Sequence, residues 1–145
     1  MTDDLTFVDT NVLIYAYDRS AAEKHAAARL RLAALWESRT GVLSTQVLQE
    51  FYVNATRKLP RPLPPARARL VIGRYATWPV HRIEPRDIIQ ASEIEQRHRL
   101  SFWDALVVVA ASRLGAAHLL TEDLQHGETI AGVRIQSPFE PDLTK

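Results

Sequence analysis

Short apolar runs alternate with longer helical patterns along this chain. Runs of three to five residues that are apolar almost throughout have the length and character of buried strands. The longer segments place apolar residues at helical spacing, and proline and glycine separate them. We therefore expect strands at 5–8, 41–43, 79–83, 117–120 and 133–135, and helices at 21–36, 44–58, 66–75, 85–98 and 101–114.

Strands that alternate with helices and lack a polar face indicate a parallel sheet covered on both faces. We predict a single α/β domain over residues 1–145, with a Rossmann-like parallel sheet of about five strands. The proline-rich segment 59–65 reads as a surface connection, because neither side of it could form a core alone.

Composition narrows the classes of protein only modestly. A chain of 145 residues with 46% hydrophobic content can bury one core. It has no cysteine, which excludes disulfides, thiolate nucleophiles and zinc–thiolate sites. The net charge of +1 excludes no partner, since polyanion binding depends on where charge lies. The residues before the first apolar run are acidic, unlike a secretory signal, and the longest apolar run, 105–111, is too short to cross a membrane. We expect a cytoplasmic protein with no membrane partner.

Four acidic residues occur where a shared divalent-metal site would place them. Asp9 and Asp123 follow the first and fourth expected strands, and Asp104 lies in the first turn of the helix that leads into the fourth. Ligands of open parallel sheets bind beyond the carboxyl ends of the strands. Glu50 lies at the border of the apolar stripe of its helix, from which it could reach the same end of the sheet. Carboxylates set against buried segments are costly unless they are paired or bind a metal.

Each acid also has an ordinary structural explanation. Asp9 could cap a helix, and Ser101 with Asp104 has the form of a capping box. Glu50 could be a solvated helix residue, and Asp123 could belong to a turn. All four of these explanations would have to be true at once for acids on one sheet, and this favours a shared site.

Three segments, 7–15, 101–105 and 120–127, resemble the signatures of the PIN-domain nucleases, and most of all the VapC-type toxins of bacterial toxin–antitoxin pairs. The resemblance implies a PIN-like fold in which an acidic quartet binds Mg²⁺ or Mn²⁺ and hydrolyses RNA with a metal-activated water, leaving a 5′-phosphate. It also implies a cognate antitoxin and a homodimer. By this resemblance the quartet is Asp9, Glu50, Asp104 and Asp123.

Two details of the site stay open at this point. Glu122 and Asp123 are adjacent, so only one can point into the site, and the Thr-x-Asp spacing favours Asp123. Asn11 and Thr121 are candidates for orienting the carboxylates, with a capping role as the alternative.

Other residues suit metal-dependent cleavage of RNA. Oxygen ligands favour Mg²⁺ or Mn²⁺, and the five histidines are too scattered to form a catalytic pair. RNA would need cations, and basic residues gather at 57–74 and 97–99, although such runs are often solvated faces. Tyr75, Trp78 and Trp103 could stack on bases, but we expect them to pack in the core.

Two other functions are compatible with the pattern. A phosphoaspartyl phosphatase or receiver-like domain would use Asp9 as a nucleophile, but Asn11 stands where such a phosphatase has a second aspartate, and no lysine ends a strand. A catalytically inactive PIN-like binding module would not need all four acids. A metal-dependent endoribonuclease accounts for more of the sequence than either.

Overall fold

The sheet is built outward from the first strand of the chain. Its strand order is β3-β2-β1-β4-β6-β5, and every neighbouring pair is parallel except β5 with β6. The computed structural model describes residues 4–141. Within them the strands are β1 (Thr6–Val8), β2 (Gly41–Ser44), β3 (Val80–His81), β4 (His118–Leu120), β5 (Thr129–Ile130) and β6 (Val133–Gln136).

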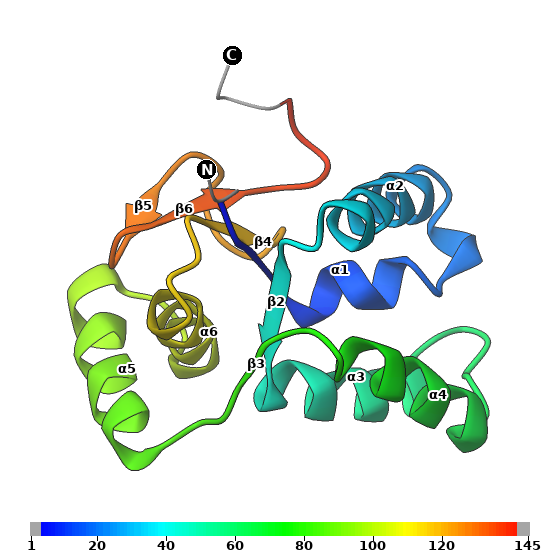
Figure 1. Cartoon of the computed structure of the whole chain (residues 1–145), viewed down its shortest axis with the longest axis horizontal. Helices are drawn as coiled ribbons and strands as arrows, with labels where there is room; N and C mark the ends of the chain where they lie inside the picture. The colour runs from blue at the N-terminus through cyan, green and yellow to red at the C-terminus, as the bar shows by residue number, and fades with distance from the viewer. Residues whose placement is uncertain (1–3, 142–145) are drawn as a thin grey trace.

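Helices cover both faces of this sheet, with α5 and α6 on one side of the strands and α1 to α4 on the other (Figure 1). This arrangement confirms the predicted α/β class with a mostly parallel sheet. The helices are α1 (Thr10–Tyr15), α2 (Glu23–Ser38), α3 (Thr45–Arg57), α4 (Pro65–Tyr75), α5 (Pro85–His98) and α6 (Phe102–Arg113), with a short 3₁₀ turn at Arg19–Ala21.

Local signals in the sequence set most helix boundaries. Ser44 and Ser101 precede α3 and α6, and each side-chain hydroxyl accepts a hydrogen bond from a backbone N–H of the first turn. Pro85 is the first residue of α5, where its missing N–H costs nothing. Gly115 follows α6 with a positive φ of 72°, a conformation that glycine adopts without strain.

Two elements differ from the expected set. Residues 10–15 form helix α1, which the sequence suggested only through the capping alternative for Asp9. A sixth strand, β5, pairs antiparallel with β6 through a tight turn at Ala131 and Gly132, both of which have positive φ. That geometry is typical of a two-residue hairpin, which usually carries Asn-Gly or Asp-Gly.

The core lies between the sheet and the helices. Every residue from Ala105 to Ala111 is buried, because α6 packs against α5 on one side and against β2, β4 and β6 on the other. Gly41 lets Trp78 pack directly on β2, since a Cβ there would lie 2.4 Å from the indole ring. Among residues 4–141 no helix combines the length and the apolar character needed to cross a bilayer.

Candidate active site

Three aspartates meet beyond the carboxyl ends of β1 and β4, which are adjacent and parallel. Asp9 follows β1, Asp123 follows β4, and Asp104 lies in the first turn of α6. Each offers one carboxylate oxygen, and these oxygens all lie within 4.8 Å of one another. We call these residues the aspartate trio. Asp9 also caps α1, since its Oδ1 accepts a hydrogen bond from the backbone N–H of Thr10 at 2.7 Å. Capping and membership of the trio therefore coexist.

Glu50 lies beside the aspartate trio but outside the group that shares the 4.8 Å spacing. Val47 and Phe51 bury the apolar side of α3, which leaves Glu50 half-buried at its border, as the helical pattern predicts. Its Oε1 accepts a hydrogen bond from the hydroxyl of Thr10 at 2.9 Å, and its Oε2 accepts one from Gln46 at 3.4 Å. Glu50 lines the same cavity as the trio.

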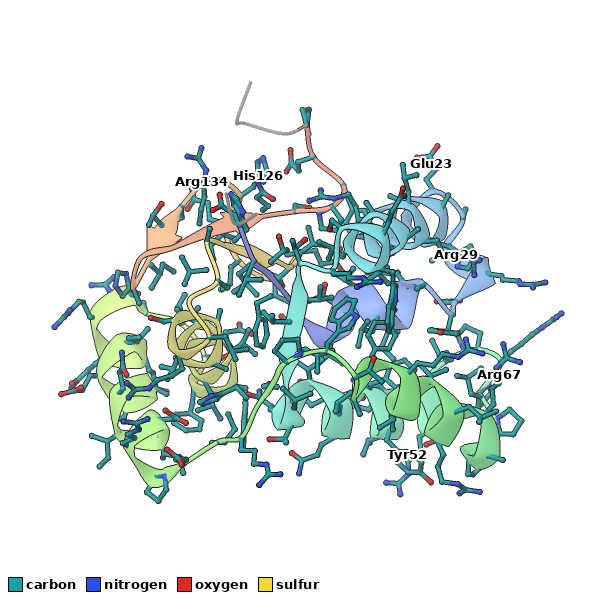
Figure 2. The ribbon with its side chains drawn as sticks, viewed as in Figure 1. Glu23, Arg29, Tyr52, Arg67, His126 and Arg134 are labelled. Carbon is teal, nitrogen blue, oxygen red and sulfur yellow. The ribbon has the colours of Figure 1, made fainter. Side chains whose placement is uncertain are left out.

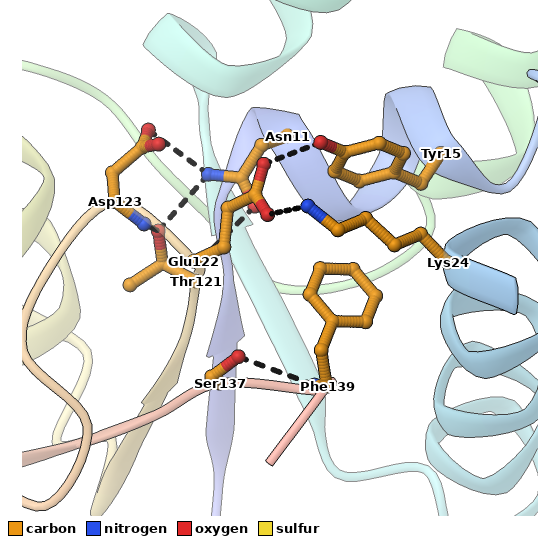
Figure 3. Close-up of polar contacts among 8 residues, drawn as sticks. All are labelled: Asn11, Tyr15, Lys24, Thr121, Glu122, Asp123, Ser137 and Phe139. Carbon is orange, nitrogen blue, oxygen red and sulfur yellow. Dashed lines mark hydrogen bonds and ion pairs between the residues drawn. The ribbon is translucent and has the colours of Figure 1, made fainter. Parts of the chain in front are cut away.

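Asn11 and Thr121 hold the carboxylates in place, and Figure 3 shows Asn11 between Thr121 and Asp123. The amide of Asn11 donates to Asp123 Oδ2 at 3.0 Å and to Asp9 Oδ2 at 3.3 Å. The hydroxyl of Thr121 donates to the same Asp9 oxygen at 2.9 Å and accepts from the backbone N–H of Asp123 at 3.1 Å. These contacts are those expected of residues that orient carboxylate ligands.

Glu122 points toward Tyr15 and Lys24, away from the carboxylate of Asp123 (Figure 3). Its carboxylate accepts hydrogen bonds from the hydroxyl of Tyr15 and from Lys24 Nζ, at 2.5 and 2.9 Å. Its backbone N–H donates to Asn11 Oδ1. Of the two adjacent acids, Asp123 is therefore the one beside Asp9, in agreement with the Thr-x-Asp spacing.

The electrostatics of the trio favour a bound cation. Burial raises the pKa of Asp9 to about 7, against hydrogen bonds from Thr10 and Thr121 that lower it, and the charges of Asp123 and Glu50 raise it further. Burial is also the main cause of the raised pKa of Asp104. Without a cation, part of this cluster holds a proton near neutral pH.

The acids line one side of a cavity of about 750 Å³. Sequence patterns did not single out Thr10 and Gln46, whose side chains hold Glu50, because an isolated threonine or glutamine carries no recognisable signal. Trp103 is a correction: we expected it in the core, but its side chain is 61% exposed and lines this cavity. Tyr75 and Trp78 are buried as expected.

The histidines have other contacts. His25 Nδ1 lies 2.8 Å from the carbonyl of Tyr15, and His81 Nε2 lies 2.7 Å from Asp87. His126 accepts from the backbone N–H of Ser137. Within residues 4–141 no histidine lines the acidic cavity, so acid–base chemistry by a histidine pair has no place there.

The residues of the site fit a hard divalent cation. The three groups that could ligate a metal ion are all carboxylates, the ligand type that Mg²⁺ and Mn²⁺ prefer. In addition, Gln46 Oε1 is buried without a hydrogen-bond partner among the described residues, so the protein leaves polar capacity at this edge unsatisfied. A bound divalent ion would neutralise the charge that these carboxylates carry together.

The fold and the site together define an α/β protein with an acidic centre at the carboxyl edge of a parallel sheet. A family model described as the PIN domain matches residues 6–129, so the chain belongs to the PIN domain family. This confirms the family resemblance drawn from the three sequence segments. No curated protein matches the sequence.

Solved structures agree on the fold. A toxin–antitoxin complex from Klebsiella pneumoniae contains a chain 20% identical, with a TM-score of 0.66 over 94% of this chain and 99% of that one. The Sarcin-Ricin loop cleaving toxin VapC20 from Mycobacterium tuberculosis is 24% identical, with a TM-score of 0.59 over 79% and 86%. A chain of DNA-bound VapBC from Salmonella typhimurium is 20% identical, with a TM-score of 0.65 over 94% and 99%. At these identities the likeness concerns the fold.

Proposed function

We propose that this protein is a metal-dependent endoribonuclease and the toxin of a toxin–antitoxin pair. The observation that carries the proposal is the aspartate trio, whose carboxylate oxygens lie within 4.8 Å of one another in a PIN-domain fold. In this proposal Asp9, Asp104 and Asp123 hold Mg²⁺ or Mn²⁺, and Glu50 completes the quartet.

The reaction is hydrolysis of a phosphodiester, in which water adds to phosphorus, the bond to the 3′ oxygen breaks, and a 5′-phosphate and a 3′-hydroxyl result. When bound, a divalent ion acidifies water and neutralises charge on the phosphate. Asn11 and Thr121 fix the direction of the Asp9 and Asp123 oxygens. Glu50, held by Thr10 and Gln46, is positioned to accept a proton from the attacking water.

The solved neighbours support the toxin assignment. One is described as a Sarcin-Ricin loop cleaving toxin, and others are toxin–antitoxin complexes that cover almost the whole of this chain. We therefore propose a cognate antitoxin as partner, RNA as substrate, a homodimer as the assembly and the cytoplasm as the location. A basic antitoxin side chain is suited to the acidic cavity, since it would supply the charge that a metal otherwise supplies.

Basic residues suited to the RNA backbone line two cavities, and residues of the proline-rich segment 59–65 line both of them. Lys58 lines the acidic cavity itself. Arg67 lines a separate hollow with Arg19 and Arg29, and Figure 2 shows Arg29 and Arg67 at the same edge of the molecule. Of the basic cluster expected from the sequence, Lys58 is therefore the residue nearest to the proposed chemistry.

The test is cleavage of RNA by the purified protein with Mn²⁺, with Mg²⁺ and with EDTA. We expect cleavage with either metal and none with EDTA. Asp104→Asn should abolish it, because the amide keeps the shape of the side chain but removes a negative ligand. Glu93→Gln, which changes an exposed acid on α5, is the matched control and should leave activity intact.

Other outcomes identify the alternatives. If Asp104→Asn kept normal metal-dependent activity, Asp104 would not be a metal ligand, and its role would be that of an acid in the first turn of α6. No cleavage of any RNA by protein that binds Mn²⁺ and its antitoxin would favour the inactive binding module. Phosphate on Asp9 that hydroxylamine releases, after treatment with a phosphodonor, would favour the phosphoaspartyl alternative.

A further inference from the structure

The environments of the three tryptophans differ. Trp78 is 8% exposed and packs on Tyr75 and Trp36. Trp36, 38% exposed, packs on Tyr75 and Trp78. Trp103 is 61% exposed, and among the described residues its one aromatic neighbour is Phe102, which meets it edge-on at 5.3 Å. An indole exposed to this extent contributes little to the core, so its position calls for another explanation.

The position of Trp103 is fixed relative to the acids. It directly precedes Asp104 in the first turn of α6. Its backbone carbonyl accepts a hydrogen bond from Gln46 Nε2 at 3.3 Å, and the same nitrogen lies 3.4 Å from Glu50. Gln46 is 6% exposed, so a buried side chain links the backbone of Trp103 to the acidic site.

The cavity beyond the aspartate trio has the mixed chemistry of a nucleotide site. Besides the trio and the acids Asp18, Glu50 and Glu122, its lining includes Trp103, the apolar Val53, the amides Gln49 and Asn54, and the cation Lys58. A nucleotide presents a flat apolar base, polar base edges and an anionic phosphate, and these features match the indole, the amides and the lysine respectively.

We propose that Trp103 is a stacking platform for an unpaired nucleobase of single-stranded RNA, next to the phosphodiester that the acids cleave. The proposal rests on the proposed endoribonuclease function and adds to it a substrate subsite. Stacking on an exposed ring tolerates every base, because each has a flat π face, and it requires a base that is free of a duplex. The protein should therefore prefer unpaired RNA to duplex RNA at this position.

The first experiment separates binding from chemistry in steady-state cleavage of a short single-stranded RNA with Mn²⁺. Trp103→Ala should raise KM roughly tenfold, within the range for loss of one base–aromatic stack, with little change in kcat. Trp103→Phe should recover most of the loss. Leu70→Ala, which removes a side chain of similar exposure (64%) on α4 outside the cavity, is the matched control. Melting temperatures of all variants check that the fold is retained.

The second experiment does not depend on cleavage. Single-stranded RNA added to Asp9→Asn protein should quench tryptophan fluorescence, and Trp103→Phe should remove that quenching while Trp36→Phe preserves it. Cleavage with an unchanged KM in Trp103→Ala would overturn the platform and leave the nuclease proposal standing. Quenching at Trp103 by protein that never cleaves RNA would support the platform and overturn the nuclease proposal. Absence of both would overturn both. A Trp103→Ala variant that binds RNA normally but loses its antitoxin would assign the indole to a protein interface and overturn the platform.

Discussion

Two buried aspartates of this protein have opposite environments. Asp87, which is fully buried near the start of α5, accepts hydrogen bonds from Arg113 Nε at 2.9 Å and from the backbone N–H of Glu84 at 2.8 Å, and His81 Nε2 lies 2.7 Å away. Asp9, at 5% exposure, has hydrogen-bond donors, but no cationic side chain among residues 4–141 pairs with it, and it faces other carboxylates.

Their pKa values move in opposite directions for this reason. Burial acts to raise the pKa of Asp87, but the donors of Glu84, His81 and Arg113 outweigh it and the pKa is lowered. Burial raises the pKa of Asp9 to about 7, and no cationic side chain of the described residues offsets it. Removing one partner of a buried ion pair is costly, so Asp87 belongs to the structure, whereas a buried acid without a counter-charge is a candidate for ligand binding.

The largest expected effect is on activity. Asp9→Asn should lower RNA cleavage by about a thousandfold or more, which corresponds to about 4 kcal/mol of transition-state stabilisation. The free energy of unfolding at neutral pH without metal should be higher than that of the parent, because the amide needs no proton and removes the repulsion among the carboxylates. Cleavage rates with Mn²⁺ and urea unfolding with EDTA measure the two quantities. Substantial cleavage by this variant would remove Asp9 from the proposed ligand set.

The next effect is on stability as a function of pH. A pKa raised from 3.8 to about 7 means that folded Asp9 keeps a proton that the unfolded chain releases. Its contribution to stability is therefore present below pH 3.8 and falls as the pH rises to about 7, by on the order of 4 kcal/mol at about 1.4 kcal/mol per unit. Asp87 acts in the opposite sense, since its contribution is lost as the pH falls through its lowered pKa.

Melting curves across pH in EDTA, with Asp9→Asn as the control, isolate the contribution of Asp9. The variant should lack most of the loss between about pH 4 and 7. Mn²⁺ at a hundred times its Kd should restore about 2.7 kcal/mol to the parent protein. Identical curves in EDTA and Mn²⁺ would contradict a shared cation site.

The next prediction concerns Asp87, the aspartate that pairs with Arg113. Asp87→Asn should lower the free energy of unfolding by about 3 kcal/mol, because it leaves Arg113 without its counter-charge, and the partial exposure of Arg113 limits the loss. The activity of each folded molecule should not change. Urea unfolding at neutral pH tests this, with Glu93→Gln on the same helix as the exposed control. A loss below about 1 kcal/mol would show that the pair is replaceable and the comparison overstated.

The sequence predicted the positions of the acids better than their surroundings. Asp9 and Asp123 could be placed because apolar strands precede them and parallel strands end at one edge. The hairpin of β5 was missed because Ala131 and Gly132 form its turn, and alanine gives no turn signal at a positive φ. The sequence did not predict the exposure of Trp103. Helix α6 is apolar almost all round, so its pattern does not show which of its residues lie outside the core.

Partners of acids are harder to predict than the acids themselves. Asp87 meets Arg113 from another helix, 26 residues away, and Glu122 meets Lys24 across 98 residues. No short-range spacing marks such pairs, because packing of the helices against the sheet creates them. The sequence favoured Asp123 over Glu122 through the Thr-x-Asp spacing, but it gave no sign of the cations that pair with Glu122 and Asp87.

The smallest expected effect concerns the adjacent acids Glu122 and Asp123. Glu122 resembles Asp87 in being paired, here with Lys24, but this ion pair is partly exposed and so contributes less. Glu122→Gln should therefore lower stability only slightly and cleavage by only a few-fold, through a small shift of the neighbouring Asp123. Lys24→Met should give a similar change. The double variant should be no less stable than either single variant, because both substitutions remove the same ion pair. Asp123→Asn should be far more damaging to cleavage than any of these. If Glu122→Gln proved as inactive as Asp123→Asn, Glu122 would take part in catalysis despite its ion pair with Lys24. A counter-charge from the protein would then no longer distinguish structural acids from functional ones.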